Sequence, residues 1–116
     1  MSFVVLFRNY HRPDMDEAAY ESAFEQMYAI VSGMDGFISI EGFGGEDGSE
    51  LAVVRFESDE AIQAWKSHPD HVRTQQRGRD EFYRAYDITV AEVTRSYNWV
   101  APASELASTD QARATG

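Results

Sequence analysis

The stretch FESDEAIQAWKSHPDH, residues 56–71, decides how this 116-residue chain can fold. Ser58, with two acidic residues after it, predicts a capped helix start, because a serine oxygen accepts a free backbone N–H and negative charge favours the helix N-terminus. Trp65 lies on the apolar face of that helix. Pro69 ends the helix, and a second helical segment follows over residues 70–83.

Working outward, apolar stretches with a period near two predict strands on both sides of these helices. Between the first two strands, Tyr20 and the apolar residues after it recur at spacings of three and four, which is typical of an amphipathic helix. Asp14 with Glu17 resembles a capping box at its start. The chain order is therefore strand, helix, strand, strand, helix pair, strand, the split βαβ arrangement of a ferredoxin-like α+β domain. The predicted strands are residues 2–10, 37–43, 51–56 and 86–99.

The first strand is apolar on both faces: Phe3 and Val5 point one way, and Val4 and Leu6 point the other. A strand with one wet face would alternate more cleanly. Helices cover one face of such a sheet, so the other face needs a different cover. The simplest cover is the same face of an identical chain, which predicts a homodimer through the sheet.

Composition narrows the function classes. The formal net charge is −10, which disfavours nucleic acid as a partner, since that binding depends on neutralising phosphates. There is no cysteine, no apolar run long enough for a membrane and no pattern of a signal peptide, so we expect a cytoplasmic protein. We expect one domain over residues 1–99. Residues 100–116 are rich in Ala, Ser and Thr and predict a flexible tail or an arm lying over a partner.

The motif of residues 56–71, an aromatic residue, a capped helix start, a tryptophan and then His-Pro-acid-His, resembles the core signature of the antibiotic biosynthesis monooxygenase family. Residues 76–83 and 92–97 resemble the segments that follow, so that the resemblance spans residues 2–99. It implies a dimeric α+β barrel with a pocket between sheet and helices in each subunit. Members of the family include cofactor-independent monooxygenases of polycyclic phenols, enzymes that degrade haem, and proteins of quinone chemistry.

The cofactor-independent branch implies a small phenol or quinol substrate whose deprotonated form reduces oxygen directly, with no metal or other cofactor. The protein then supplies hydrogen-bond donors, an apolar wall and exclusion of water. The resemblance gives Trp65 as the wall. His71 is the expected proton acceptor, and the other side chains are of the types such a pocket needs. The expected catalytic residues are Trp65, His71, Tyr83 and Arg79, and the expected substrate-binding residues are Phe7, Asn9, Phe24 and Tyr86.

Two other functions remain open from sequence. One is a non-catalytic dimeric protein that binds a small aromatic ligand in the same pocket. The other is haem binding or degradation, for which the resemblance requires an asparagine on the first strand, a tryptophan on the second helix and a histidine ten residues later. Trp65 fits, but Gln75 stands where the histidine would be, and Asn9 falls late on its strand.

Ordinary structural roles compete with these assignments. Trp65 fits a core position at least as well as a pocket wall. His68, beside a helix break, favours capping over chemistry, and His11 favours an exposed loop at the end of the first strand. Because Pro69 separates His68 from His71, we expect no metal site. We interpret the basic residues of positions 66–84 as a solvated helix face paired with acidic neighbours.

Overall fold

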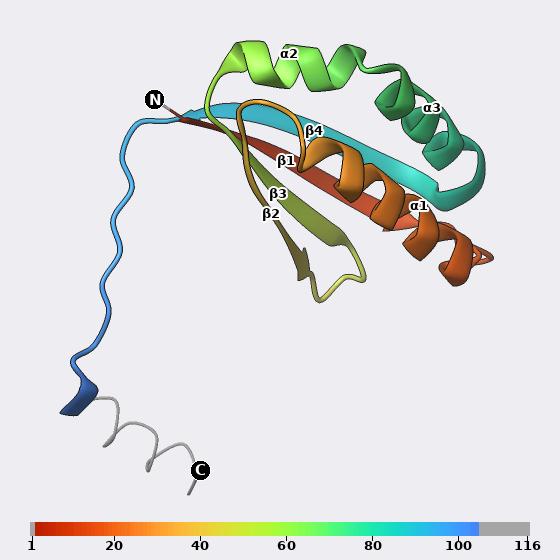
Figure 1. The fold of residues 1–116 in the computed structure, drawn as a ribbon. Coiled ribbons are helices and arrows are strands. Elements are labelled where there is room, and N and C mark those ends of the chain that lie inside the picture. The colour runs from red at the N-terminus through yellow and green to blue at the C-terminus, as the bar shows by residue number, and fades with distance from the viewer. Residues whose placement is uncertain (1, 105–116) are drawn as a thin grey trace, which may run out of the picture.

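A computed structural model, which describes residues 2–104, contains one antiparallel sheet with the strand order β2-β3-β1-β4. Strand β1 is central and pairs with β3 on one side and β4 on the other. Figure 1 shows the helices together on one face of this sheet. The strands are β1 (Ser2–His11), β2 (Phe37–Gly44), β3 (Glu50–Phe56) and β4 (Tyr83–Val93). The helices are α1 (Glu17–Val31), α2 (Asp59–Ser67), α3 (Pro69–Arg77) and the π-helical turn η1 (Gly78–Phe82). The predicted ferredoxin-like α+β order is confirmed.

Two of the expected helix caps are present. The Ser58 hydroxyl accepts the backbone N–H of Ala61 at 3.1 Å, as predicted for the start of α2. The Nδ1 atom of His68 accepts the backbone N–H of Asp70 at 3.1 Å, so His68 caps α3. These bonds satisfy N–H groups that have no partner within the helix.

Other predicted boundaries were wrong. Asp16, not Asp14, caps α1, accepting the backbone N–H of Ala19 at 3.0 Å. The reason is a turn before the helix, closed by a bond from the Met15 N–H to the Arg12 carbonyl at 3.1 Å. The helix predicted over residues 70–83 begins one residue earlier and gives way to η1 after Arg77.

The last strand spans Tyr83–Val93 rather than residues 86–99, because its limits are set by its partner β1. His11 pairs with Tyr83 at one end, and Ser2 pairs with Val93 at the other. Beyond Val93 no strand of residues 2–104 lies beside the chain, and it leaves the sheet (Figure 1). Of the predicted tail, residues 105–116 lie outside the described part of the chain.

The core lies between the sheet and the helices. Its buried members come from α1, β3 and α2, and Phe3 and Val5 of β1 pack against them. Trp65 is 9% exposed, which fits the predicted core role. Among the residues described, no helix combines the length and the apolar character needed to cross a membrane. The buried members are Val31, Phe56, Ala61, Ile62 and Trp65.

In the part of the chain that the structure describes, the other face of the sheet carries no helix (Figure 1). Val4 pairs across with Ala91 of β4, and Leu6 pairs with Val53 of β3, so these four side chains share that open face. All four are only partly buried in the single chain. The predicted division of β1 into two apolar faces is therefore confirmed.

Gly36 provides a test of how the helix layer docks on the sheet. It has φ +86°, and an added Cβ would lie 2.6 Å from the Cβ of Ala61 on α2. We expect Gly36→Ala to lower the free energy of unfolding by about 1–3 kcal/mol, because it combines backbone strain with a clash. Urea unfolding followed by circular dichroism measures this.

The control is Gly42→Ala, at a strand position where an added Cβ meets nothing within 4 Å. We expect it to change stability by less than about 0.5 kcal/mol. Equal losses for the two variants would contradict the close approach of Gly36 to α2.

Candidate functional site

A row of polar side chains crosses three strands on the helix-covered face. Asn9 pairs with Glu50 of β3 on one side and with Tyr86 of β4 on the other. Asn9 is 2% exposed, and its side-chain oxygen Oδ1 has no hydrogen-bond partner. A buried acceptor without a donor is costly, so this oxygen is available to a ligand that carries a hydrogen-bond donor.

Aromatic rings surround that row. The ring of Phe7 lies 5.4 Å from the ring of Tyr83 and 5.3 Å from that of Tyr86, and the two tyrosine rings lie 5.9 Å apart. The contact between Phe7 and Tyr83 is edge-on, a favourable geometry for rings. We call Phe7, Asn9, Arg79, Tyr83 and Tyr86 the Tyr83 cluster. Five of the eight predicted site residues are thus brought together.

The π-helical turn η1 carries Arg79, the positively charged residue of this cluster. Its turn is closed by a bond from the Tyr83 N–H to the Gly78 carbonyl, and the Nε atom of Arg79 donates to the Tyr86 hydroxyl at 2.8 Å. Arg12 fastens the turn to the end of β1, since its side chain donates to the carbonyls of Arg79 and Tyr83. Single π-turns within helices are common at functional sites.

Gly78 is the point of closest approach in this turn. It is buried, and a Cβ added there would lie 2.7 Å from the ring of Tyr83. Its backbone φ is −57°, so glycine is needed here for space and not for conformation. The Tyr83 ring therefore lies directly on the backbone of η1.

Trp65 and His71 form a second group. Their rings lie 4.4 Å apart with an interplanar angle of 35°, and the Nδ1 atom of His71 is buried without a hydrogen-bond partner. Burial lowers the pKa of His71 below its usual value, with the charge of His68 acting in the same direction and the Lys66 carbonyl opposing it. His71 is therefore neutral near pH 7, the state in which imidazole accepts a proton.

The two groups are neighbours along the helix-covered face of β1. Val5 packs against the core that contains Trp65, and Phe7, two residues on, packs in the Tyr83 cluster. Phe24, also predicted for the pocket, is 40% exposed on α1 and lies in neither group. The structure thus places seven of the eight predicted residues in two adjoining groups.

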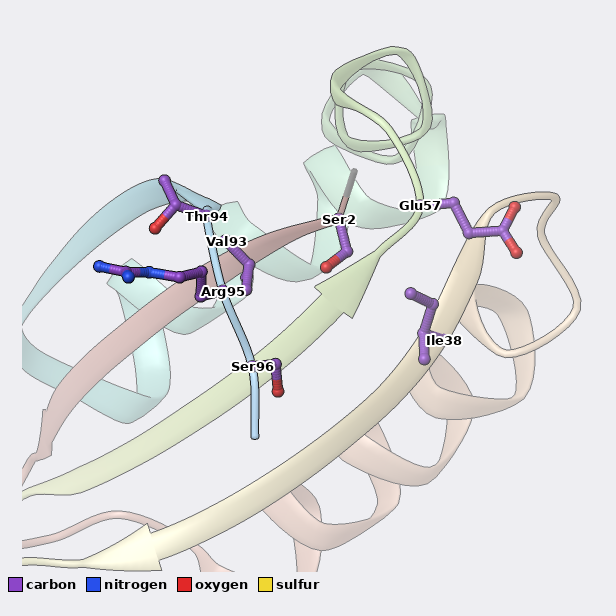
Figure 2. A pocket seen from close by; sticks show the side chains of 7 residues that line it. All are labelled: Ser2, Ile38, Glu57, Val93, Thr94, Arg95 and Ser96. Carbon is purple, nitrogen blue, oxygen red and sulfur yellow. The ribbon is translucent and has the colours of Figure 1, made fainter. Parts of the chain in front are cut away.

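Two open hollows of the described chain lie elsewhere. The first, of about 470 Å³, lies where β4 ends, between Ile38 and the departing residues 94–96 (Figure 2). The second, of about 600 Å³, lies beside the β2–β3 hairpin around Arg8 and Asp47. Neither hollow includes a residue of the Tyr83 cluster or of the Trp65–His71 group.

Sequence reasoning missed three polar residues beside Tyr83. The sequence predicted an exposed loop position for His11. The structure places it instead at the end of β1, with a side chain 24% exposed. Its ring lies 4.7 Å from that of Tyr20, and both side chains approach Glu50. The two-residue alternation of β1, continued from Phe7, was the signal for His11. No local signal identifies Glu50, since its position depends on strand register.

Of the basic residues at positions 66–84, Arg73 and Arg77 on α3 pair with acidic neighbours as predicted, whereas Arg79 donates to Tyr86. Arg73 pairs with Asp70, and Arg77 pairs with Glu81 at 2.6 Å, all on the surface. Such exposed pairs contribute little to stability. Within residues 2–104, no three His, Asp or Glu side chains are placed to hold a metal ion.

The arrangement suits proton transfer and the binding of an oxygen-bearing aromatic ligand. His71 is a neutral acceptor against an indole, and Asn9 offers an acceptor oxygen in an apolar surrounding. Burial raises the pKa of Tyr83 far above its usual value, so its hydroxyl stays protonated and acts as a donor. Donors held in a dry site stabilise developing negative charge on a ligand oxygen.

Comparison with known proteins adds a family and a fold. The sequence profile of the family described as antibiotic biosynthesis monooxygenase matches residues 2–77. The chain is 29% identical over 80 residues to the uncharacterized protein YqjZ of Bacillus subtilis (strain 168), covering 69% of this chain and 70% of that protein.

Solved structures share the fold. Rv0793 from Mycobacterium tuberculosis matches with a TM-score of 0.72 and 19% identity, covering 84% of this chain and 100% of that one. SnoaB, a cofactor-independent oxygenase from Streptomyces nogalater, matches with a TM-score of 0.68 and 13% identity, covering 82% of this chain and 95% of that one. At these identities the likeness concerns the fold alone.

The buried, neutral state of His71 predicts a pH dependence of stability. Because its pKa is lowered by folding, the unfolded chain takes up a proton more readily as the pH falls below about 6.5. The contribution of neutral His71 to the free energy of unfolding is therefore complete above that pH. It is lost as the pH falls toward the lower pKa that His71 has in the folded chain. We expect His71→Gln to lose less stability than the unaltered protein between pH 7.5 and pH 5.5 in urea unfolding.

The control is His68→Asn, since asparagine can cap α3 in place of His68. This variant should keep most of the pH dependence of the unaltered protein, because burial, the main cause of the lowered pKa of His71, remains. An identical pH dependence in His71→Gln would show that His71 is not buried in its neutral form.

Proposed function

Because the chain belongs to the antibiotic biosynthesis monooxygenase family, we propose that it is a cofactor-independent monooxygenase acting on a small phenol- or quinol-like substrate. The observation that carries the proposal is the contact between Trp65 and a buried, neutral His71, with rings 4.4 Å apart. It supplies an apolar wall and a proton acceptor at one place. The Tyr83 cluster, which lies next along β1, supplies the groups that would stabilise an anion: the Tyr83 hydroxyl and the positive charge of Arg79.

In the proposed reaction the substrate lies between the Trp65–His71 group and the Tyr83 cluster. The His71 imidazole takes the proton of a substrate hydroxyl, which leaves an electron-rich phenolate. Tyr83 donates a hydrogen bond to the phenolate oxygen, and the positive charge of Arg79 favours the anion. The Trp65 ring excludes water from this side of the site.

The phenolate then reduces molecular oxygen. One oxygen atom forms a new C–O bond at the ring and becomes a quinone carbonyl, and the other leaves as water. A phenol plus one O₂ gives a quinone plus one H₂O, and the four electrons that O₂ accepts all come from the substrate. The reaction therefore balances without a further reductant.

Oxygen uptake tests the proposal. With a panel of phenols and hydroquinones at pH 7.5, we expect one O₂ consumed for each quinone formed from a phenol. His71→Gln should lower kcat by about 100-fold, the usual effect of removing a general base. An oxygen electrode and quinone absorbance give the two quantities independently.

A matched pair of tyrosine variants is the control. Tyr83→Phe removes a hydroxyl from the proposed site and should lower kcat about tenfold or more. Tyr28→Phe removes one from the outside of α1, where Tyr28 is 45% exposed, and should leave kcat unchanged. Binding of a phenol without oxygen uptake would indicate a non-catalytic ligand-binding protein instead, and a Soret band on adding haem would indicate the haem alternative.

We further propose that two copies pair through the open face of the sheet, as the sequence predicts. Val4, Leu6, Val53 and Ala91 lie there, and no helix among the described residues covers them. Residues 94–100 carry Tyr97, Trp99 and Val100, each at least 75% exposed, and we place this segment over the partner chain. Large exposed apolar side chains in one segment are typical of an interface.

Sedimentation tests this pairing. We expect the protein to sediment at about twice its chain mass of 13.1 kDa, and Leu6→Glu to convert it to a folded monomer, because a charge would be buried between the sheets. Trp99 emission should shift to longer wavelength in that monomer. Val72→Glu adds the same charge on the exposed side of α3 and should leave the dimer intact. A dimeric Leu6→Glu would rule out this interface.

A further inference from the structure

The hollow beside the β2–β3 hairpin belongs to the open face of the sheet. This hollow, which we call the hairpin hollow, has Arg8, Phe43 and Leu51 on its sheet side. Arg8 pairs with Leu51, and Leu51 pairs with Phe43, so the three form one row across β1, β3 and β2. The row lies two residues along from Leu6 and Val53 and therefore continues the apolar surface through which two copies are proposed to pair.

One carboxylate orders the rim of the hairpin hollow. Asp47 accepts the guanidinium of Arg8 at 2.9 Å and the hydroxyl of Tyr10 at 3.2 Å. It also accepts the backbone N–H of Ser49 at 3.0 Å. The hairpin is thus fastened to β1 before anything binds, and a preformed surface of this kind lowers the cost of association.

The chemistry of the hairpin hollow is apolar and slightly acidic. Phe43 is 53% exposed, and a phenyl ring beside a guanidinium is a surface on which aromatic side chains pack. The charged residues of the lining are Arg8, Glu46 and Asp47, one positive and two negative, which leaves one negative charge. The hollow therefore suits a segment that carries aromatic rings and a positive charge.

Residues 94–100, which we call the arm, have this chemistry. They leave the sheet after Val93, which pairs with Ser2 at the end of the open face away from the hairpin (Figure 2). The arm carries the exposed side chains of Tyr97 and Trp99, and its one charged residue is Arg95. Tryptophan, tyrosine and arginine are the residues that most often anchor an interface.

A two-fold pairing brings arm and hollow together. Tyr97 lies four residues beyond Val93, or roughly 13 Å of extended chain, and packed sheets lie about 10 Å apart. The arm runs away from its own sheet (Figure 1), so it is directed toward a second chain. An axis that runs across the strands places the arm end of each sheet over the hairpin end of the other, and both arms and both hollows are then used.

We propose that the arm of one copy docks in the hairpin hollow of a second copy of this chain. Tyr97 and Trp99 pack against the partner's Phe43 and the partner's Arg8, and Arg95 lies beside the partner's Glu46. The formal charge of the chain is −10, so two copies repel one another and this local pairing of opposite charges favours one orientation. The inference rests on the pairing proposed above and adds the contact that fixes it.

Charge reversal in the full-length protein tests the docking. Sedimentation over a dilution series gives the Kd of the dimer. We expect Arg95→Glu and Glu46→Arg each to raise this Kd about tenfold, because each brings like charges together. The double variant restores opposite charges and should return the Kd to within about threefold of that of the unaltered protein.

The control is Glu25→Arg on the exposed side of α1, which makes the same change in net charge away from the open face and should not raise the Kd. Trp99→Ala should raise the Kd about 30-fold, as expected for an anchoring tryptophan. Equal effects of Glu46→Arg and Glu25→Arg, or no recovery in the double variant, overturn the inference.

Because the chain has no cysteine, a disulfide can probe the contact directly. Under mild oxidation, the double variant Phe43→Cys/Trp99→Cys should form a covalent dimer, and neither single variant should do so. Val72→Cys/Trp99→Cys, with one cysteine on the exposed side of α3, should remain unlinked. A disulfide within one chain would show that the arm folds over its own sheet, and it would overturn the inference.

These measurements separate the docking of the arm from the pairing of the sheets. A dimer whose Kd is unchanged by the arm variants overturns the docking and leaves the pairing through Leu6 in place. A protein that stays monomeric at every concentration overturns both. Oxygen uptake is measured separately, so its presence or absence does not alter either conclusion.

Discussion

The pairing of β1 between β3 and β4 is the constraint on which the rest of the structure depends. Side chains alternate along a strand, so this register places every second residue of β1 under the helices. Phe3 and Val5 complete the core, and Phe7, Asn9 and His11 continue the same row into the candidate site. The alternate residues form the open face. A shift of the register by one residue would exchange the core and the open face, and would remove the site altogether.

The fold was largely readable from sequence because its signals are local. The cap at Ser58 and the amphipathic pattern of α2 lie within a few residues of the features that they specify. The end of β4 was not readable, because strand-forming residues continue past Val93, whereas the described pairing with β1 stops at Ser2 and Val93. The start of α1 was misplaced for a related reason. Asp14 and Asp16 are both good caps, and the preceding turn selects the second.

The candidate site divides in the same way. Trp65 and His71 are close in sequence and on successive helices, so their contact followed from a short motif. The environment of Tyr83 could not be predicted from a motif, because it combines residues from β1, α1, β3 and β4 that no sequence periodicity connects. A buried asparagine oxygen and a buried imidazole nitrogen, both without partners, are further features that only the folded chain reveals. A buried polar atom without a hydrogen-bond partner is unusual in a folded protein, and a bound ligand that supplies the partner would explain it.

The π-helical turn η1 has a consequence for how this protein can change during evolution. A π-turn holds one residue more than the α-helical turn it replaces, so a difference of one residue in chain length separates the two. Losing one residue between Gly78 and Phe82 would restore regular winding and would rotate Arg79 and its neighbours by roughly 100° relative to β4. The contact between Arg79 and Tyr86 would then be lost while α3 and the sheet remained intact. Related chains can therefore gain or lose this cation by a single change in length, with no substitution at the site itself.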